Sequence, residues 1–145
     1  DVIHLGDGTD DLTFLDTRGR EVYTVFGNLE EWQYPHLASS KNALFQLIDL
    51  FGTKTLIMHG HRASVKDGIE KAVAQAHAAG ADLLLHGHTH IPVDVYLPAG
   101  KAVGDTVLSK PLRVFNPGSV GRGEPPSYGI LTFRGGELLT SHCKK

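Results

Sequence analysis

The sequence is poor in cysteine, and Cys143 is the only one in 145 residues. A lone thiol cannot form a disulfide within the chain, and it cannot supply the several thiolates that a cysteine-type structural zinc site requires. Low cysteine use is typical of a reducing compartment, so we predict a cytoplasmic protein. The length suits one domain with its own hydrophobic core.

Long apolar runs and an excess of either charge are also lacking. No run approaches the roughly 20 residues that a membrane-spanning helix needs. The 14 Lys and Arg residues nearly balance the 16 Asp and Glu residues, which leaves a net charge of −2. This balance gives no sign of a nucleic-acid partner, and we expect no contact with a membrane surface.

Histidine, by contrast, is abundant, with nine residues. Four of them form two pairs separated by one residue, His59 with His61 and His88 with His90. Imidazole is the commonest metal ligand in proteins, so this clustering predicts a metal site. The other histidines are isolated or flank a pair. We expect ordinary surface or hydrogen-bonded roles for His4, His36, His77, His86 and His142.

The apolar pattern predicts an α/β fold with a β-rich C-terminal third. One clear helix is expected at residues 64–79, with Ser64 as its N-cap and Gly80 after its last turn. Residues 30–42 are polar and contain Pro35, so a loop is expected there. Short strands, paired as hairpins toward the C-terminus, are predicted at residues 2–5, 21–26, 43–50, 53–58, 81–86, 93–97, 107–108, 113–115, 128–133 and 137–141.

Polar motifs follow five of the predicted strands. Ligands bind beyond the carboxyl ends of strands in open α/β sheets, so these turns should converge on one rim. Glycine beside each polar residue lets the backbone turn sharply and approach a ligand closely. The five turns are Gly6-Asp7, Gly27-Asn28, His59-Gly60-His61, Gly87-His88-Thr89-His90 and Asn116-Pro117-Gly118-Ser119.

The side chains of these turns combine carboxylate, amide and imidazole groups without thiolate. Such oxygen and nitrogen ligands suit Mn, Fe, Ni or Zn in open, hydrolytic sites. A carboxylate at a turn can bridge two metal ions, which can hold a bridging hydroxide and clamp a phosphoryl group. The candidate metal ligands are Asp7, Asn28, His59, His88 and His90.

In this order, the motifs resemble the signature of calcineurin-like metallophosphoesterases. With Asn116-Pro117-Gly118-Ser119 they are similar to the small single-domain phosphodiesterase branch, which also contains a retromer subunit used as a scaffold. The resemblance implies one domain over residues 1–145 with a four-layer αββα sandwich, in which two mixed sheets are flanked by helices.

The resemblance also implies roles for single residues. Asp7 would bridge two divalent ions, with manganese favoured over iron, nickel or zinc. Asn28, His59 and His88 would complete the coordination of one ion, and His90 would bind the other. The catalytic residues would be Asp7, Asn28, His59 and His88, and the substrate contacts would be His61 and Asn28.

Two departures from the family pattern stand out. The Asp-x-His motif that completes the second metal is absent, so its strand and the following helix are expected to precede residue 1, unless the protein is mononuclear. Leu29 follows Asn28 where relatives carry His or Cys, so no proton donor is assigned and substrates with good leaving groups are expected.

The sequence therefore predicts a hydrolase that acts on phosphodiesters or phosphomonoesters through a metal-bridging hydroxide. The alternative is a protein-binding scaffold of the same fold with little or no catalysis. Arg62 and Arg122 lie next to motif turns, although solvated positions are expected for both. The Gly-containing hairpin at residues 98–109 is a candidate contact of a homodimer.

Overall fold

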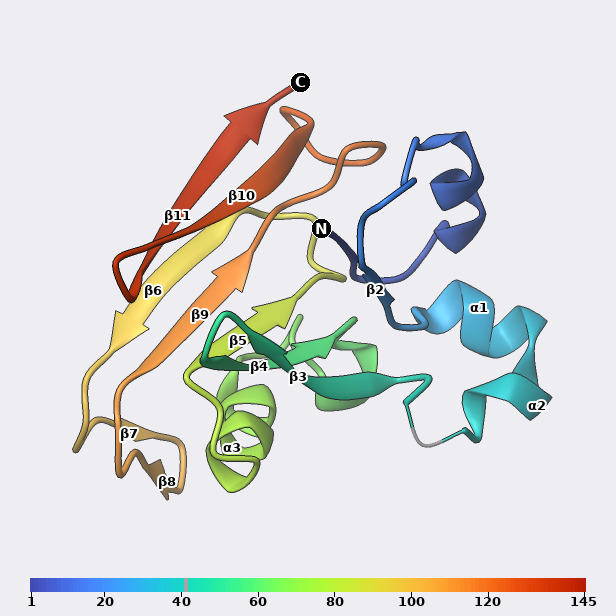
Figure 1. Cartoon of the computed structure of the whole chain (residues 1–145). Coiled ribbons are helices and arrows are strands. Elements are labelled where there is room, and N and C mark those ends of the chain that lie inside the picture. The colour runs from blue at the N-terminus through green and yellow to red at the C-terminus, as the bar shows by residue number, and fades with distance from the viewer. Residues whose placement is uncertain (41) are drawn as a thin grey trace.

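A five-stranded mixed sheet forms the centre of the structure, a computed structural model that describes residues 1–40 and 42–145 (Figure 1). Its strands, in spatial order, are β3 (Phe45–Leu50), β4 (Thr53–Met58), β5 (Leu83–His86), β9 (Leu112–Asn116) and β6 (Val93–Leu97). The three inner strands β4, β5 and β9 are parallel, and the edge strands β3 and β6 are antiparallel to their neighbours. The carboxyl ends of the inner strands therefore lie at one edge, where His59, Gly87 and Pro117 follow them.

Three two-stranded sheets and several short helices surround this sheet. Strand β1 (Val2–His4) is parallel to β2 (Val22–Thr24), while β7 (Ala102–Val103) with β8 (Thr106–Val107) and β10 (Ser127–Arg134) with β11 (Glu137–Lys144) are antiparallel pairs. The helical segments are η1 (Thr9–Phe14), α1 (Asn28–Gln33), α2 (Pro35–Ala38), η2 (His61–Ala63) and α3 (Glu70–Ala78). None of the described helices is long and apolar enough to cross a membrane.

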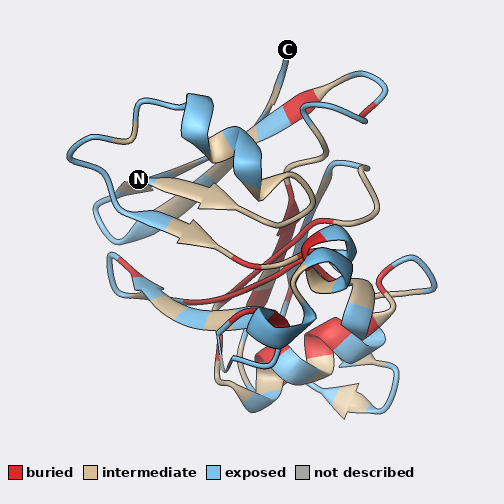
Figure 2. Cartoon of the chain, turned by 90° about the vertical axis from the view of Figure 1, so that its right-hand side faces the viewer, coloured by how far each residue is buried: buried red, intermediate tan, exposed pale blue. Residues whose placement is uncertain are grey.

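Two hydrophobic cores lie on opposite faces of the central sheet, because side chains alternate along each strand. One core packs Leu84 and its neighbours against Ala72, Val73 and Ala76 of α3. The other joins Leu83, Leu85 and Phe115 to residues of β1, β2, β10 and β11. Figure 2 shows the buried residues concentrated between these layers. The predicted sandwich with a mixed sheet flanked by helices is confirmed, and its second β layer consists of the β1–β2 and β10–β11 sheets.

The helix predicted at residues 64–79 is wrong in its first third. Helix α3 begins only at Glu70, and Ser64 has a left-handed backbone with φ of 54°, so it is not the N-cap of this helix. Val65 is buried in the core beside α3, and its N–H bonds the carbonyl of Gly60 at 3.3 Å. The apolar residue Val65 falls at helical spacing because it is buried in a turn. Sequence periodicity alone does not distinguish a buried turn from a helix.

The loop predicted at residues 30–42 is also wrong where it overlaps α1 and α2, while Lys41 lies outside the described residues. Gly27 is the N-cap of α1, and Glu30 at the third helical position reaches back to the Gly27 N–H. Pro35 opens α2, so the expected break at this proline is confirmed. The two short helices form because a cap and tertiary contacts compensate for a polar sequence.

The strands are predicted more accurately than the helices. The hairpin of residues 43–58 is confirmed as β3–β4, and the C-terminal hairpin as β10–β11. Residues 98–109 contain the β7–β8 hairpin, which packs against α3. Strand β9 departs from the hairpin pattern, because it lies parallel to β5 in the central sheet.

Candidate metal centre

The turns that follow β1 and β2 pack directly against each other. A Cβ atom on Gly6 would overlap the backbone nitrogen of Gly27, and a Cβ atom on Gly27 would overlap the Asp7 carboxylate. Asp7 itself has a left-handed backbone, with φ of 57°. The two glycines therefore allow a contact that places Asp7 beside the first residue of α1, Asn28.

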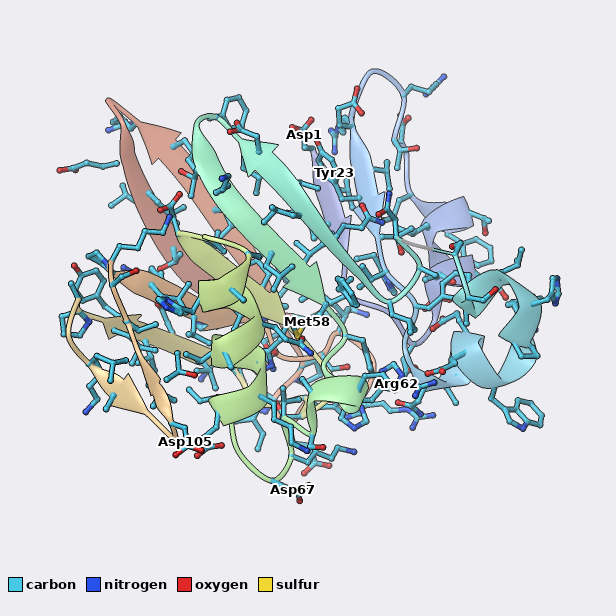
Figure 3. All side chains as sticks on the ribbon, turned by 90° about the horizontal axis from the view of Figure 1, so that it is seen from below. Asp1, Tyr23, Met58, Arg62, Asp67 and Asp105 are labelled. Carbon is cyan, nitrogen blue, oxygen red and sulfur yellow. The ribbon has the colours of Figure 1, made fainter. Side chains whose placement is uncertain are left out.

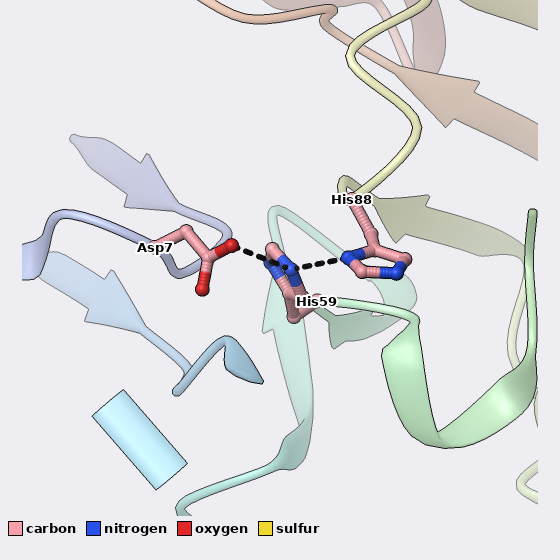
Figure 4. Close-up of side chains that lie close together, drawn as sticks. All are labelled: Asp7, His59 and His88. Carbon is pink, nitrogen blue, oxygen red and sulfur yellow. Dashed lines mark hydrogen bonds and ion pairs between the residues drawn. The ribbon is translucent and has the colours of Figure 1, made fainter. Parts of the chain in front are cut away.

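Asp7, His59 and His88 bring their ligand atoms within 4.8 Å of one another (Figure 4). His59 Nε2 lies 2.9 Å from His88 Nδ1 and 3.4 Å from Asp7 Oδ2. These residues come from three different strand ends, those of β1, β4 and β5. The structure thus joins three of the five predicted ligands in one cluster.

The ring of His59 is fixed by the turn that follows β1. Its Nδ1–H donates to the carbonyl of Leu5 at 2.6 Å, which leaves Nε2 facing Asp7 and His88. The His59 carbonyl in turn accepts the N–H of Gly87 at 3.0 Å. Only 2% of His59 is exposed; its ring is held by the Leu5 carbonyl and its backbone by the N–H of Gly87. A hydrogen bond of this kind sets the tautomer of a metal-binding histidine.

Both imidazoles of the cluster are neutral near pH 7. Burial lowers the pKa of His59, although the Leu5 carbonyl and Asp7 oppose this effect. Burial, followed by the nearby charges of His59, Lys66 and His61, lowers the pKa of His88 to about 4. A neutral imidazole has a free lone pair, which is the form that binds a metal.

The distances of His59 Nε2 from its two neighbouring ligand atoms are close to those found around a divalent ion. Metal–nitrogen bonds of about 2.1 Å that meet at angles of about 90–110° separate their ligand atoms by about 3.0–3.4 Å. The observed separation of 3.4 Å lies within this range, and that of 2.9 Å lies just below it. One carboxylate and two imidazoles form the mixed donor set of hydrolytic metal sites, and three protein ligands leave positions open for water and substrate.

The other predicted site residues are His90, Asn28 and His61. His90 has φ of 61° and lines the same cavity as Asp7 and His88. Asn28 is exposed at the start of α1, and the next residue, Leu29, donates its N–H to Asp7 Oδ1 at 2.9 Å. The ring of His61 lies 5.3 Å from that of His59. Asp7, His59 and His88 thus form the observed cluster, and metal binding by His90 and Asn28 stays a prediction.

A cavity of about 490 Å³ opens over the cluster. Its opposite wall is the segment from Pro117 to Arg122. Asn116 is fully buried and connects the two sides of the cavity. Its side-chain NH₂ group donates to the Gly87 carbonyl at 3.1 Å, and its side-chain oxygen Oδ1 accepts the Gly118 N–H at 2.9 Å. The turn at residues 116–119 therefore shapes the rim of this cavity.

Glu31 organises a second group beside the centre. Its carboxylate accepts a hydrogen bond from His61 Nε2 at 2.6 Å and pairs with the guanidinium of Arg62. Figure 3 labels Arg62, which lies in the short helix η2 after β4. The Arg62 hydrogen bond, with that of His61, lowers the pKa of Glu31 to about 2. Arg62 is thus engaged with Glu31, whereas Arg122 lines the cavity.

Three histidines outside the paired motifs have structural contacts, as expected. His4 Nδ1 accepts the Gly6 N–H at 3.2 Å, and His142 Nε2 donates to the Asn116 carbonyl at 2.7 Å while its ring stacks on Phe115. His86 is buried at the end of β5 beside Asn116.

Glu30 and Glu31 were not among the predicted site residues, and both lay in a predicted loop. A glycine followed three positions later by glutamate is the spacing of an N-terminal helix cap. Gly27 and Glu30 have this spacing, and it was the available signal for both the helix and the buried carboxylate.

The sequence profile of the calcineurin-like phosphoesterase superfamily domain matches residues 1–136. The chain belongs to this superfamily. No curated protein sequence matches it significantly. The strand-end turns that carry Asp7, His59 and His88 are therefore those of a phosphoesterase domain.

Solved structures of low sequence identity share the fold. A predicted phosphoesterase from Streptococcus pneumoniae is 19% identical, with a TM-score of 0.62 over 98% of this chain and 72% of the other. A Vps29 mutant from Entamoeba histolytica is 21% identical, with a TM-score of 0.64 over 100% and 82%. An archaeal phosphodiesterase is 23% identical, with a TM-score of 0.59 over 99% and 83%.

Proposed function

We propose that the chain is a metal-dependent phosphoesterase that hydrolyses phosphodiesters or phosphomonoesters. The observation that carries this proposal is the cluster of Asp7, His59 and His88, which opens into a cavity in a domain of the calcineurin-like superfamily. The binuclear form would use Asp7, Asn28, His59 and His88 for one ion and Asp7 with His90 for the other. Manganese is the ion we favour, with iron, nickel or zinc as alternatives.

The chain's own residues have distinct tasks in this proposal. Bound divalent ions supply a nucleophile from water at neutral pH and polarise the phosphoryl group. Leu5 holds the His59 ring, and the Leu29 N–H orients the Asp7 carboxylate. Asn28 is exposed at the start of α1, where its amide can meet a phosphate oxygen of the substrate. His61, held by Glu31, would contact the substrate from the other side.

Leu29 bears on the choice of substrate. Its side chain lines the cavity beside Asp7 and cannot donate a proton to a leaving group. We therefore expect p-nitrophenyl diesters, whose leaving group needs no protonation, to react much faster than alkyl diesters. Comparable rates on the two would contradict this expectation and require another acid in the site.

Hydrolysis of bis-p-nitrophenyl phosphate with and without added Mn²⁺ tests the proposal. The matched variants are His88→Asn and His36→Asn, since Asn tolerates the left-handed backbone of His88 and His36 is exposed on α2. We expect the first change to lower metal-dependent turnover by about 1,000-fold, because an active-site ion contributes several kcal/mol to the transition state. Turnover that needs no metal, or that survives in His88→Asn, would overturn the proposal.

The second candidate is a protein-binding scaffold. Two large exposed apolar side chains favour it, since Phe14 on η1 is 86% exposed and Trp32 on α1 is 84% exposed. A protein that binds Mn²⁺ but hydrolyses neither diesters nor monoesters would be assigned to this class. The lone Cys143 supports a cytoplasmic location for either function.

A further inference from the structure

Glu30 is a buried carboxylate beside the candidate metal centre that is not one of the predicted ligands. It occupies the third position of α1, and only 4% of the residue is exposed. No Lys or Arg among the described residues forms an ion pair with it. A buried charge of this kind is costly unless hydrogen bonds replace the lost water.

Backbone donors surround both oxygens of this carboxylate. Oε2 accepts the N–H groups of Asp7 and Gly27, each at 2.8 Å. Oε1 accepts the N–H of Gly8 at 2.7 Å and that of Thr9 at 3.0 Å, with the Thr9 hydroxyl at 3.2 Å. Three successive amides of one turn and the cap of α1 therefore converge on a single side chain.

The ionised form of Glu30 is the one that fits this site. Burial alone would raise its pKa, but the hydrogen bonds from Thr9, Gly8, Asp7 and Gly27 outweigh burial and lower the pKa to about 2. Five donors leave no place for a proton or for an amide –NH₂ group. The carboxylate therefore acts only as an acceptor at neutral pH.

The segment that Glu30 holds has an unusual backbone. Gly6, Asp7 and Gly8 all have positive φ, at 88°, 57° and 108°. For the non-glycine Asp7 this conformation is uncommon, and it persists because surrounding contacts maintain it. The three N–H bonds to Glu30 are contacts of that kind.

We infer that Glu30 is a positioning residue that fixes the Asp7 carboxylate for metal binding. Asp7 is held from two directions by the first turn of α1, since its N–H bonds the Glu30 side chain and its Oδ1 accepts the Leu29 N–H. Its other oxygen, Oδ2, faces His59 Nε2 at 3.4 Å. The inference rests on the proposed function in that it assigns a metal to Asp7.

The test measures metal binding directly, by calorimetric titration of Mn²⁺ into the metal-free protein. Glu30→Gln keeps the shape of the side chain but places an –NH₂ group against backbone donors. We expect its dissociation constant for Mn²⁺ to rise by about 10- to 100-fold, the usual cost of losing a group that orients a metal ligand. Glu137→Gln, an exposed change on β11, is the matched control and should bind Mn²⁺ as the wild type does.

A second variant separates positioning from simple loss of fold. Glu30→Asp keeps the charge but shortens the side chain by one methylene, so it should recover part of the lost affinity. In ¹⁵N spectra of the metal-free protein, the amide signals of Asp7, Gly8 and Gly27 should shift in both variants. A Glu30→Gln protein that is folded and binds Mn²⁺ within twofold of the wild type would overturn the inference, as would a wild type without metal affinity.

Binding and turnover distinguish this inference from the proposed function. If the wild type binds Mn²⁺ but hydrolyses no phosphate ester, the function fails while the affinity of Glu30→Gln still decides the role of Glu30. If the wild type is an active enzyme and Glu30→Gln binds the ion equally well, only the positioning role fails.

Discussion

The two halves of the candidate metal centre are built in different ways. The imidazole half, His59 and His88, follows the inner strands β4 and β5 of the central sheet, and β5 is buried along its whole length. The carboxylate half, Asp7, follows β1, which pairs with β2 in a separate two-stranded sheet that is only partly buried. Strand pairing and core packing position the backbone of His59, whose ring the Leu5 carbonyl orients, whereas the buried Glu30 side chain accepts three N–H groups of the turn that carries Asp7.

This contrast shows how one site combines two sources of rigidity. Groups on buried parallel strands are oriented by the same contacts that stabilise the fold. A turn on a small sheet has fewer such contacts and needs its own hydrogen-bond acceptor. We expect changes in the imidazole half to affect both folding and metal binding, and changes at Asp7 to affect metal binding alone.

The largest effects are expected from removing one ligand in each half. His59→Ala deletes a buried ring and leaves the Leu5 carbonyl without its donor, so it should lower the free energy of unfolding by about 2–4 kcal/mol. Asp7→Asn keeps the shape, the acceptor for the Leu29 N–H and a residue type that tolerates positive φ. Its unfolding free energy should change by less than about 1 kcal/mol.

Both variants should lose measurable Mn²⁺ binding in calorimetry. Urea unfolding of the metal-free proteins, followed by far-ultraviolet circular dichroism, supplies the stabilities, with His36→Asn as the surface control. Equal destabilisation by the two changes would contradict the contrast between the halves.

The two halves should also respond to acid in different pH ranges. The pKa of His88 is lowered to about 4 and that of His59 is lowered as well, so the unfolded chain binds more protons than the folded one below the ordinary value of 6.5. Stability of the metal-free protein should therefore fall by about 1–3 kcal/mol as the pH drops from 7 to 4.5. His88→Asn should make this dependence shallower.

Glu30 contributes in the same sense but at lower pH. Its pKa is about 2 in the folded protein against an ordinary value of 4.5, so its stabilisation is complete above pH 4.5 and is lost as the pH falls toward 2. Urea unfolding at pH 7, 5.5 and 4.5 should thus show the histidine effect without that of Glu30. A flat profile for the wild type over this range would show that burial does not perturb the imidazoles.

The sequence was sufficient for the imidazole half of the site and for most strands. Parallel strands with polar residues at their carboxyl ends must bring those residues together, so His59 and His88 could be placed without a structure. Local helical structure was harder, because Val65 and Glu30 owe their positions to tertiary contacts. A polar residue such as Glu30 is expected to be solvent-exposed from the sequence, because the backbone N–H donors around it are brought together only by the tertiary structure.

The smallest effect is expected at the rim, where two arginines differ in their surroundings. Arg62 pairs with Glu31, whereas Arg122 lines the cavity opposite the metal cluster. Arg122→Gln should raise KM for bis-p-nitrophenyl phosphate by about 3- to 10-fold with little change in kcat, because an exposed charge contact contributes about 1 kcal/mol to binding. Arg62→Gln should leave KM within about twofold, as its guanidinium is already committed to a carboxylate. Steady-state kinetics at saturating Mn²⁺ separate the two, and a larger effect at Arg62 would mean that the Glu31 pair opens to meet the substrate.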